Sequence, residues 1–303
     1  MREGTRRVVL AALSANLGIA VAKFVGFAMT GSASLLAEAV HSVADTGNQG
    51  LLFLGGIRAQ REPTEEHPFG YGRERYFWAF IVALVLFTFG SLFALYEGVA
   101  KIRHPHQLES PAWAIGILLL ALVLESLALR TAAGEANRLR RGEPWWTFIR
   151  RAKSPEVPVV LLEDTGAVVG LLFALAGIGL ALVTGDARFD AAGSVAIGLL
   201  LGVIAIVLAG EMKSLLIGEA ARPRQALRIR ELLASASHFR QIHELRTLHV
   251  GPDEILVAAK VELDAALSFE EVATALDQAE LQVRAEVPEV RWMYLEPQQS
   301  VPG

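Results

Sequence analysis

Long apolar segments constrain the fold of this chain more than any other feature. A bilayer core about 30 Å thick requires roughly 20 apolar residues of helix. The segments that meet this length are 8–30, 34–57, 76–98, 112–130, 157–183 and 189–217. Because lipid offers no partner to unpaired backbone N–H and C=O groups, each segment must be helical. The sequence therefore predicts an all-α membrane bundle of six transmembrane helices.

Basic residues gather on one side of these predicted helices. One set of loops carries Arg2, Arg6, Arg7, Arg58, Arg61, Arg73, Arg75, Arg138, Arg140, Arg141, Arg150, Arg151 and Lys153. The loops of the opposite side carry only Lys101, Arg103 and Arg188. Positive charge favours the cytoplasmic side. An even number of spans then places both termini in the cytoplasm. Because the sequence has no recognisable targeting extension, we expect a multi-pass protein of the cell (inner) membrane.

The pattern changes after Gly218, where apolar blocks give way to a mixed sequence. Residues 224–237 and 268–286 read as amphipathic helices, and 244–250, 255–263 and 290–295 read as strands. Ser268 and Glu271 have the spacing of a capping box. The sequence therefore predicts a six-helix membrane domain, 1–218, followed by a small cytoplasmic α+β domain, 219–303, of order αββαβ.

Composition excludes several classes of protein. The chain has no cysteine, which rules out a disulfide framework and a thiolate metal site. The net charge is -4, so no global basic field indicates a nucleic-acid partner. Metal chemistry in this chain would depend on nitrogen and oxygen donors.

Polar side chains inside the second span are the first candidates for function, because charged groups at that depth are costly. His41, Asp45 and Asn48 are four and seven residues apart, which places them on one face of a helix. An imidazole and a carboxylate one turn apart form half of a site for a borderline divalent ion. The alternative is a His–Asp pair that satisfies itself between helices.

The fifth span carries two adjacent acids, Glu163 and Asp164, well inside an apolar helix. Two unpaired carboxylates at that depth favour their protonated forms. A metal ion between the second and fifth spans would displace those protons, which is a physical basis for proton–metal exchange. Successive helix residues point about 100° apart. We therefore expect one acid to be a ligand and the other a supporting group or proton site.

The motif His41-Ser-Val-Ala-Asp45-Thr-Gly-Asn48 resembles the second span of the cation diffusion facilitator (zinc transporter) family. The loop from Pro63 to Arg73 is similar to that family's cytoplasmic loop, and the resemblance covers nearly the whole chain. It is nearest to the branch of human zinc transporter family member nine, which shares the Leu-Leu-Glu-Asp-Thr motif of the fifth span.

The resemblance implies a homodimer that moves a metal by alternating access, driven by proton antiport. Zinc is the first candidate substrate, with manganese, iron or cobalt as alternatives. The resemblance implies His41, Asp45 and Asp164 as metal ligands. The family's fourth ligand falls on Val160, which cannot bind metal, so Glu163 or a water would complete the site. No prosthetic group is implied.

Several alternatives remain open from the sequence. A metal-binding membrane sensor or scaffold would use the same residues without transport. An enzyme is not expected, since the His-Glu-x-x-His pattern of metalloproteases is missing. Weaker metal candidates are the acidic loop at His67 and the tail histidines, His238, His243 and His249.

Two further acids lie in the predicted spans. Glu125 of the fourth span either lines a pathway or pairs with Lys23 or an arginine. Asp190 opens the sixth span, where the positive end of the helix dipole favours an acid.

Overall fold

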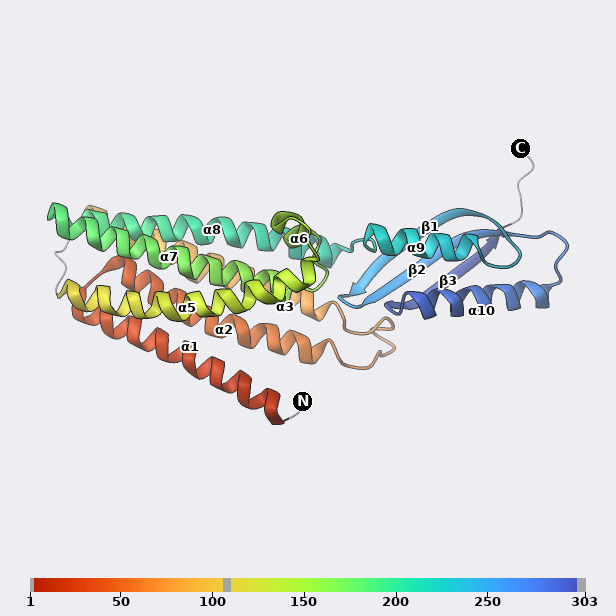
Figure 1. Ribbon diagram of the computed structural model, residues 1–303, viewed down its shortest axis with the longest axis horizontal. Helices are drawn as coiled ribbons and strands as arrows, with labels where there is room; N and C mark the ends of the chain where they lie inside the picture. The colour runs from red at the N-terminus through yellow and green to blue at the C-terminus, as the bar shows by residue number, and fades with distance from the viewer. Residues whose placement is uncertain (1–2, 106–109, 299–303) are drawn as a thin grey trace. The chain divides into compact units, whose positions relative to one another are not determined.

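The chain folds into two compact units (Figure 1). The computed structural model describes residues 3–105 and 110–298, with side chains from residue 17 onward. The helical unit holds residues up to 56 together with 77–212, and the α/β unit holds 57–76 together with 213 onward. The N-terminal arginines used in the topology prediction, Arg2, Arg6 and Arg7, lie outside the described side chains.

Every predicted apolar segment is helical. The helices of this region are α1 (Glu3–Thr30), α2 (Ala33–Arg58), α3 (Glu74–Val85), the π-helical turn η1 (Leu86–Leu92), α4 (Phe93–Arg103), α5 (Pro111–Arg140), α6 (Trp145–Arg151), α7 (Glu156–Thr184) and α8 (Arg188–Ile217). Most boundaries agree with the prediction to within a few residues. The clear exception is α5, which continues past Arg130 because Ala, Glu, Leu and Arg favour helix even where the chain turns polar.

Four helical stretches of the described chain are long and apolar enough to cross a membrane. They are Glu74–Arg103, Pro111–Arg140, Glu156–Thr184 and Arg188–Ile217. The described apolar part of α1, Leu17–Thr30, is shorter. Although α2 has 26 residues, acids and a histidine interrupt its apolar sequence, and it is not among these four. The structure thus supports a membrane protein with several apolar helices.

Glycines and small hydroxyl groups bring α8 close to the helical stretch Glu74–Arg103. A side chain at Gly198 would meet the backbone of Leu95 and Ser91 at about 3 Å, so only glycine fits there. The Ser91 hydroxyl donates to the Gly198 carbonyl at 2.7 Å, and the Ser194 hydroxyl donates to the Ala94 carbonyl at 2.9 Å. These contacts hold α8 against η1 and α4.

Asp190 fixes the start of α2, besides lying in the first turn of its own helix α8. Its carboxylate accepts from the Ser32 hydroxyl at 2.7 Å and from the Ala33 amide at 2.7 Å. It also accepts from the amide and the hydroxyl of Ser34. The first amides of a helix lack intrahelical partners, and here an acid distant in sequence supplies one. The sequence predicted a helix-start residue but not which helix it would cap.

The α/β unit confirms the predicted order αββαβ. It contains α9 (Pro223–Ala234), β1 (Phe239–Gly251), β2 (Glu254–Leu263), α10 (Phe269–Glu286) and β3 (Val290–Gln298). The sheet order is β1-β2-β3, with β1 and β2 antiparallel and β2 and β3 parallel. The predicted capping box is present, because the Glu271 amide donates to the Ser268 hydroxyl and the Ser268 amide donates to the Glu271 carboxylate.

One face of this sheet is the core of the unit. Alternate residues of β2, from Ile255 to Leu263, are buried against apolar side chains of α9 and α10. Alternation of this kind is expected of a sheet with one covered face. The opposite face of the sheet carries the charged and polar residues.

Residues 57–76, between α2 and α3, pack on the same unit. Phe69 meets Trp292 of β3 edge-to-face, with 5.6 Å between ring centroids. Arg75 pairs with Asp253 at 3.5 Å. Gly72 lies so close to the β1–β2 turn that a side chain there would meet the Val250 carbonyl at 2.8 Å. The loop is therefore an integral part of the α/β unit.

Candidate functional site

The polar face of α2 lies inside the helical unit, as the sequence predicted. The side chain of His41 is fully buried, and that of Asp45 is 15% exposed. Nδ1 of His41 lies 3.4 Å from Oδ1 of Asp45, one helical turn away. An imidazole beside a carboxylate in a nonpolar interior is a potential pair of metal donors.

A second contact links this face to α7. Nδ2 of Asn48 donates to Oε1 of Glu163 at 2.6 Å, and both side chains are buried. The neighbouring acid, Asp164, is half-buried. Of the two acids of α7, Glu163 is thus the one with a hydrogen bond to α2.

Several donor and acceptor atoms at this site have no hydrogen bond within the described part of the chain. These atoms are Nδ1 and Nε2 of His41, Oδ1 of Asp45 and Oδ1 of Asn48, all shielded from solvent. Buried polar atoms in proteins are nearly always paired, and an exception calls for an explanation such as a bound ion or water. These atoms are therefore candidates to bind an ion or a water molecule.

The described side chains do not form a complete set of metal ligands. No group of three or more His, Asp and Glu side chains among the described residues is close enough to hold an ion. His41 and Asp45 are adjacent, whereas convergence of Asp164 and Glu163 on the same ion stays a prediction. Val160, one turn before Asp164, offers only an apolar side chain.

A buried network of charges lies beside the α2 face. Nζ of Lys23, on α1, lies 3.1 Å from Oε2 of Glu38 and 3.8 Å from Oε1 of Glu125. It also donates to the Ser42 hydroxyl at 2.7 Å. The pairing of Glu125 with Lys23, one of its two interpretations, is therefore present. The role of Glu38 was missed, although an acid seven residues before Asp45 lies on the same helix face and was visible in the sequence.

The weaker metal candidates outside the helical unit have other contacts. His67 is exposed and stacks on Tyr71, with 4.6 Å between ring centroids. His238 lies 3.4 Å from Asp264, and His243 lies 3.1 Å from Glu262. The pKa of Asp264 is held below its usual value by hydrogen bonds from Arg240 and His238. The two histidine–acid pairs lie at the surface, where ion pairs contribute little to stability.

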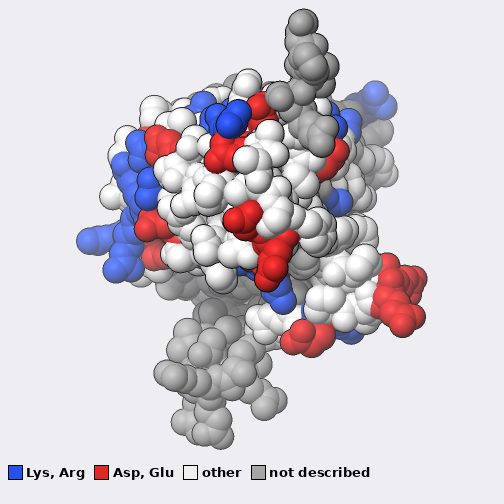
Figure 2. All heavy atoms as spheres, turned by 90° about the vertical axis from the view of Figure 1, so that its right-hand side faces the viewer, with Lys and Arg blue, Asp and Glu red and all other residues white. Residues whose placement is uncertain are grey.

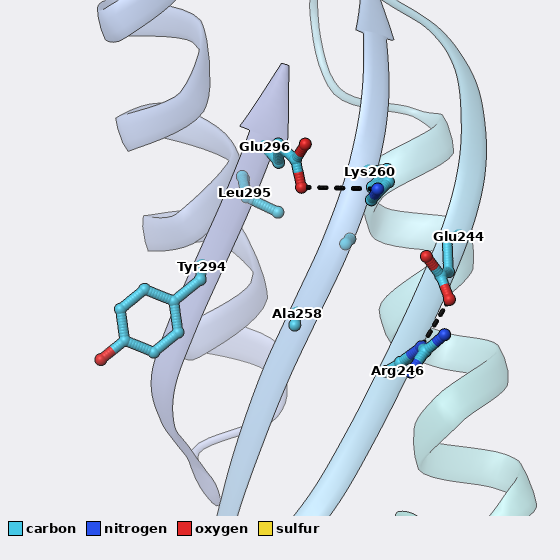
Figure 3. Close-up of a pocket in the computed structure, with 8 residues that line it drawn as sticks. Glu244, Arg246, Ala258, Lys260, Tyr294, Leu295 and Glu296 are labelled. Carbon is cyan, nitrogen blue, oxygen red and sulfur yellow. Dashed lines mark hydrogen bonds and ion pairs between the residues drawn. The ribbon is translucent and has the colours of Figure 1, made fainter. Parts of the chain in front are cut away.

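A shallow hollow of about 430 Å³ lies on the open face of the sheet (Figure 3). Its walls are two ion pairs, Arg246 with Glu244 and Lys260 with Glu296, and Ala258 lies between them. Tyr294 stands beside the hollow from β3. Because these charges already neutralise one another, the hollow does not favour a ligand of either sign.

Charges of both signs are interspersed on the face of the molecule drawn in Figure 2. That face therefore lacks the one-sided basic field typical of nucleic-acid binding.

Comparison with known proteins identifies two matching regions. Residues 9–217 match the family model of the cation efflux transmembrane domain. Residues 222–294 match the model of the cytoplasmic domain of cation efflux proteins.

Individual relatives agree with these matches. The mitochondrial proton-coupled zinc antiporter SLC30A9 of Homo sapiens is 35% identical over 264 residues, which is 86% of this chain and 46% of that protein. Metal tolerance protein C4 of Arabidopsis thaliana is 30% identical over 86% of this chain and 57% of its own length. The metal cation efflux system protein CzcD of Cupriavidus metallidurans is 27% identical over 65% of this chain and 57% of its own length.

This chain spans about half the length of these relatives. A solved structure of the MamM CTD has a TM-score of 0.25 and 15% identity, and it covers 26% of this chain and 94% of that one. The assignment therefore rests on the family models and on the sequence identities. The chain belongs to the cation efflux family, a family of membrane transporters and not of enzymes.

Proposed function

We propose that this protein carries a divalent metal cation across a membrane in exchange for protons. Zinc is the first candidate for the transported metal. The observation that carries the proposal is the buried face of α2. There, His41 has no hydrogen bond from either ring nitrogen within the described chain, and it lies beside Asp45. Neutral imidazole and carboxylate are donors that a borderline divalent ion accepts. The SLC30A9 relatives are proton-coupled zinc antiporters, which supports this proposal.

The coupling follows from the cost of burying charge. Carboxylates in a dry interior are stable when they bind either a proton or a cation. Arrival of a dication at Asp45 and an acid of α7 would release protons, and arrival of protons would release the metal. Asp164 is the proposed ligand from α7. Glu163 or a water would supply the fourth donor, since Val160 has none.

The membrane arrangement that fits this function has six spans. The four helical stretches that are long and apolar enough provide four of them, and α1 and α2 would be the other two. The lower hydropathy of α2 is expected of a helix whose polar face lines a transport site. With the basic loops inside, both termini would be cytoplasmic and the protein would lie in the cell (inner) membrane.

We propose a homodimer as the working assembly. Support comes from the match of residues 222–294 to the cytoplasmic domain model of cation efflux proteins. The open face of the sheet (Figure 3) offers exposed area for a second copy. Chemical cross-linking in detergent, followed by mass determination, would detect a dimer.

An uptake assay tests the proposed function. The full chain is reconstituted into liposomes, and entry of Zn²⁺, Mn²⁺, Fe²⁺ and Co²⁺ is measured with and without an imposed pH gradient. We expect zinc flux that increases when protons can flow in the opposite direction. Empty liposomes are the control. Zinc flux no greater than in empty liposomes would contradict the proposal.

A non-transporting metal sensor is the second candidate. The apolar Val160 and the incomplete donor set of the described residues favour it. A sensor would bind zinc and change the conformation of the α/β unit without any flux in the same liposomes.

A further inference from the structure

Lys23 is a buried cation that the proposed transport mechanism does not use. Its side chain is completely shielded from solvent on α1. An ammonium group inside a membrane domain is costly unless anionic partners compensate for it. Its position therefore requires explanation.

Two other helices contribute partners to this ammonium group. Glu38 lies at 3.1 Å and the Ser42 hydroxyl at 2.7 Å, both from α2, and Glu125 of α5 lies at 3.8 Å. The other carboxylate oxygen of Glu38, Oε1, has no hydrogen bond within the described chain. It faces Gly170 of α7, where an added side chain would overlap it.

The network adjoins the predicted metal ligands. Ser42 follows His41 directly, and Glu38 precedes Asp45 by seven residues on the same helix face. Charges interact over such short separations when the surroundings are poorly polar. A dication held by His41 and Asp45 would therefore be repelled by Lys23 and attracted by Glu38 and Glu125.

We propose that Lys23 is an internal counter-cation that lowers the affinity of the transport site for its metal. This inference rests on the proposed function. Lys23 neutralises Glu38 and Glu125, whose negative charge would otherwise attract a dication, and it repels a dication at Asp45. The metal is then bound weakly enough to be released on the far side of the membrane. Lys23 acts through charge and is not itself a ligand.

Two variants, one that removes the positive charge of Lys23 and one that removes the negative charge of Glu38, test this proposal. Zinc affinity of the full chain in detergent is measured by calorimetry with Zn²⁺ alone. Removal of one unit charge near a dication in a partly polar interior changes affinity by about tenfold or more. We expect Lys23→Met to bind zinc about tenfold more tightly and Glu38→Gln about tenfold more weakly. The double variant, in which the net charge is restored, should return to within about threefold of the original protein.

Flux measurements separate a charge effect from loss of structure. Lys23→Met should lower the KM for zinc and also lower the maximal rate, because tighter binding slows release. Lys23→Arg, which keeps the charge, should retain both values. A purely structural role of Lys23 predicts weaker binding and a higher KM instead.

Two results would overturn the inference. One is a folded Lys23→Met protein with unchanged or weaker zinc affinity, judged by a single symmetric peak in size-exclusion chromatography. If Lys23→Met does not fold, the overturning result is a zinc affinity of Glu38→Gln equal to that of the original protein. The affinity series is read from binding alone. Failure of flux in the original protein would therefore reject the proposed function without deciding the role of Lys23.

Discussion

Several buried polar side chains in the helical unit connect different helices. Lys23 links α1 to α2 and α5, Asn48 links α2 to α7, and Asp190 links α8 to the start of α2. Side-chain hydrogen bonds between membrane helices average less than about 1 kcal/mol each, because the unfolded chain in the membrane also finds partners. Several bonds to one charged acceptor should amount to more.

Asp190 provides a test at this scale. Asp190→Ala leaves buried donors of Ser32, Ala33 and Ser34 without their acceptor, and unsatisfied buried groups cost about 1–3 kcal/mol. We expect a loss of at least about 2 kcal/mol of stability. Thermal unfolding in detergent, followed by tryptophan fluorescence, should show a Tm lower by at least about 4 °C.

The matched control is Asp186→Ala, four residues earlier, in the connection between α7 and α8. Asp186 is exposed and accepts one hydrogen bond, from the Arg188 amide. We expect its Tm to change by less than half as much. Equal losses in the two variants would mean that Asp190 does not fix the start of α2.

The sequence was informative about residues whose role depends on helical spacing. Offsets of four and seven placed His41, Asp45 and Asn48 on one buried face, and the structure agrees. The partner of Asp190 and the network of Glu38 could not be predicted, because they depend on which helices become neighbours. Spacing along one helix does not contain that information.

At the scale of elements, close approach of α8 to η1 and α4 depends on glycine. A side chain at Gly198 would lie 2.7 Å from Cγ of Leu95 and 3.0 Å from the Ser91 carbonyl. Gly198→Ala must therefore separate these helices, at a cost of about 1–3 kcal/mol. Gly210, on the same helix, has no atom within 4 Å of an added side chain.

We expect Gly198→Ala to lower Tm in detergent by several degrees. Gly210→Ala should leave Tm unchanged or raise it slightly, because alanine favours helix over glycine by about 1 kcal/mol. Equal Tm values for the two variants would show that α8 does not pack this closely.

The connection between α2 and α3 gives a second test of an element. An added side chain at Gly72 would meet the Val250 carbonyl at 2.8 Å and Cα of Gly251 at 2.9 Å. We expect Gly72→Ala to displace residues 57–76 from the α/β unit. Trypsin should then cleave at Arg61 and Arg73 several times faster, as measured by mass spectrometry.

Gly134→Ala is the control for this experiment, since a side chain there has open space on α5. It should leave the cleavage rate unchanged. A Gly72→Ala protein cleaved at the original rate would contradict the packing of this loop on the sheet.

Elements were more predictable than their contacts. Apolar length predicted α7 and α8, and strict alternation predicted β2, because backbone satisfaction and one-sided burial leave few other choices. The π-helical turn at Leu86–Leu92 was not predicted. Packing of residues 57–76 on the sheet was also missed, since it depends on tertiary contacts such as Phe69 with Trp292.

At the scale of the whole molecule, the chain combines a helical unit with buried charged side chains and a separate α/β unit. The buried side chains of the helical unit include Glu38, Glu163, His41 and the compensating ammonium group of Lys23. The α/β unit includes residues 57–76, which connect the helix that bears His41 and Asp45 to the helix that follows.

The central claim is that the acids of α2 and α7 hold the same ion, and zinc titration of single and double variants tests it most directly. Calorimetry of the full chain should show one binding event that both Asp45→Asn and Asp164→Asn remove. The double variant should lose no more than either single variant, because groups that act as one unit are non-additive. If each single variant removes a different binding event, and the double variant removes both, the two acids do not share an ion.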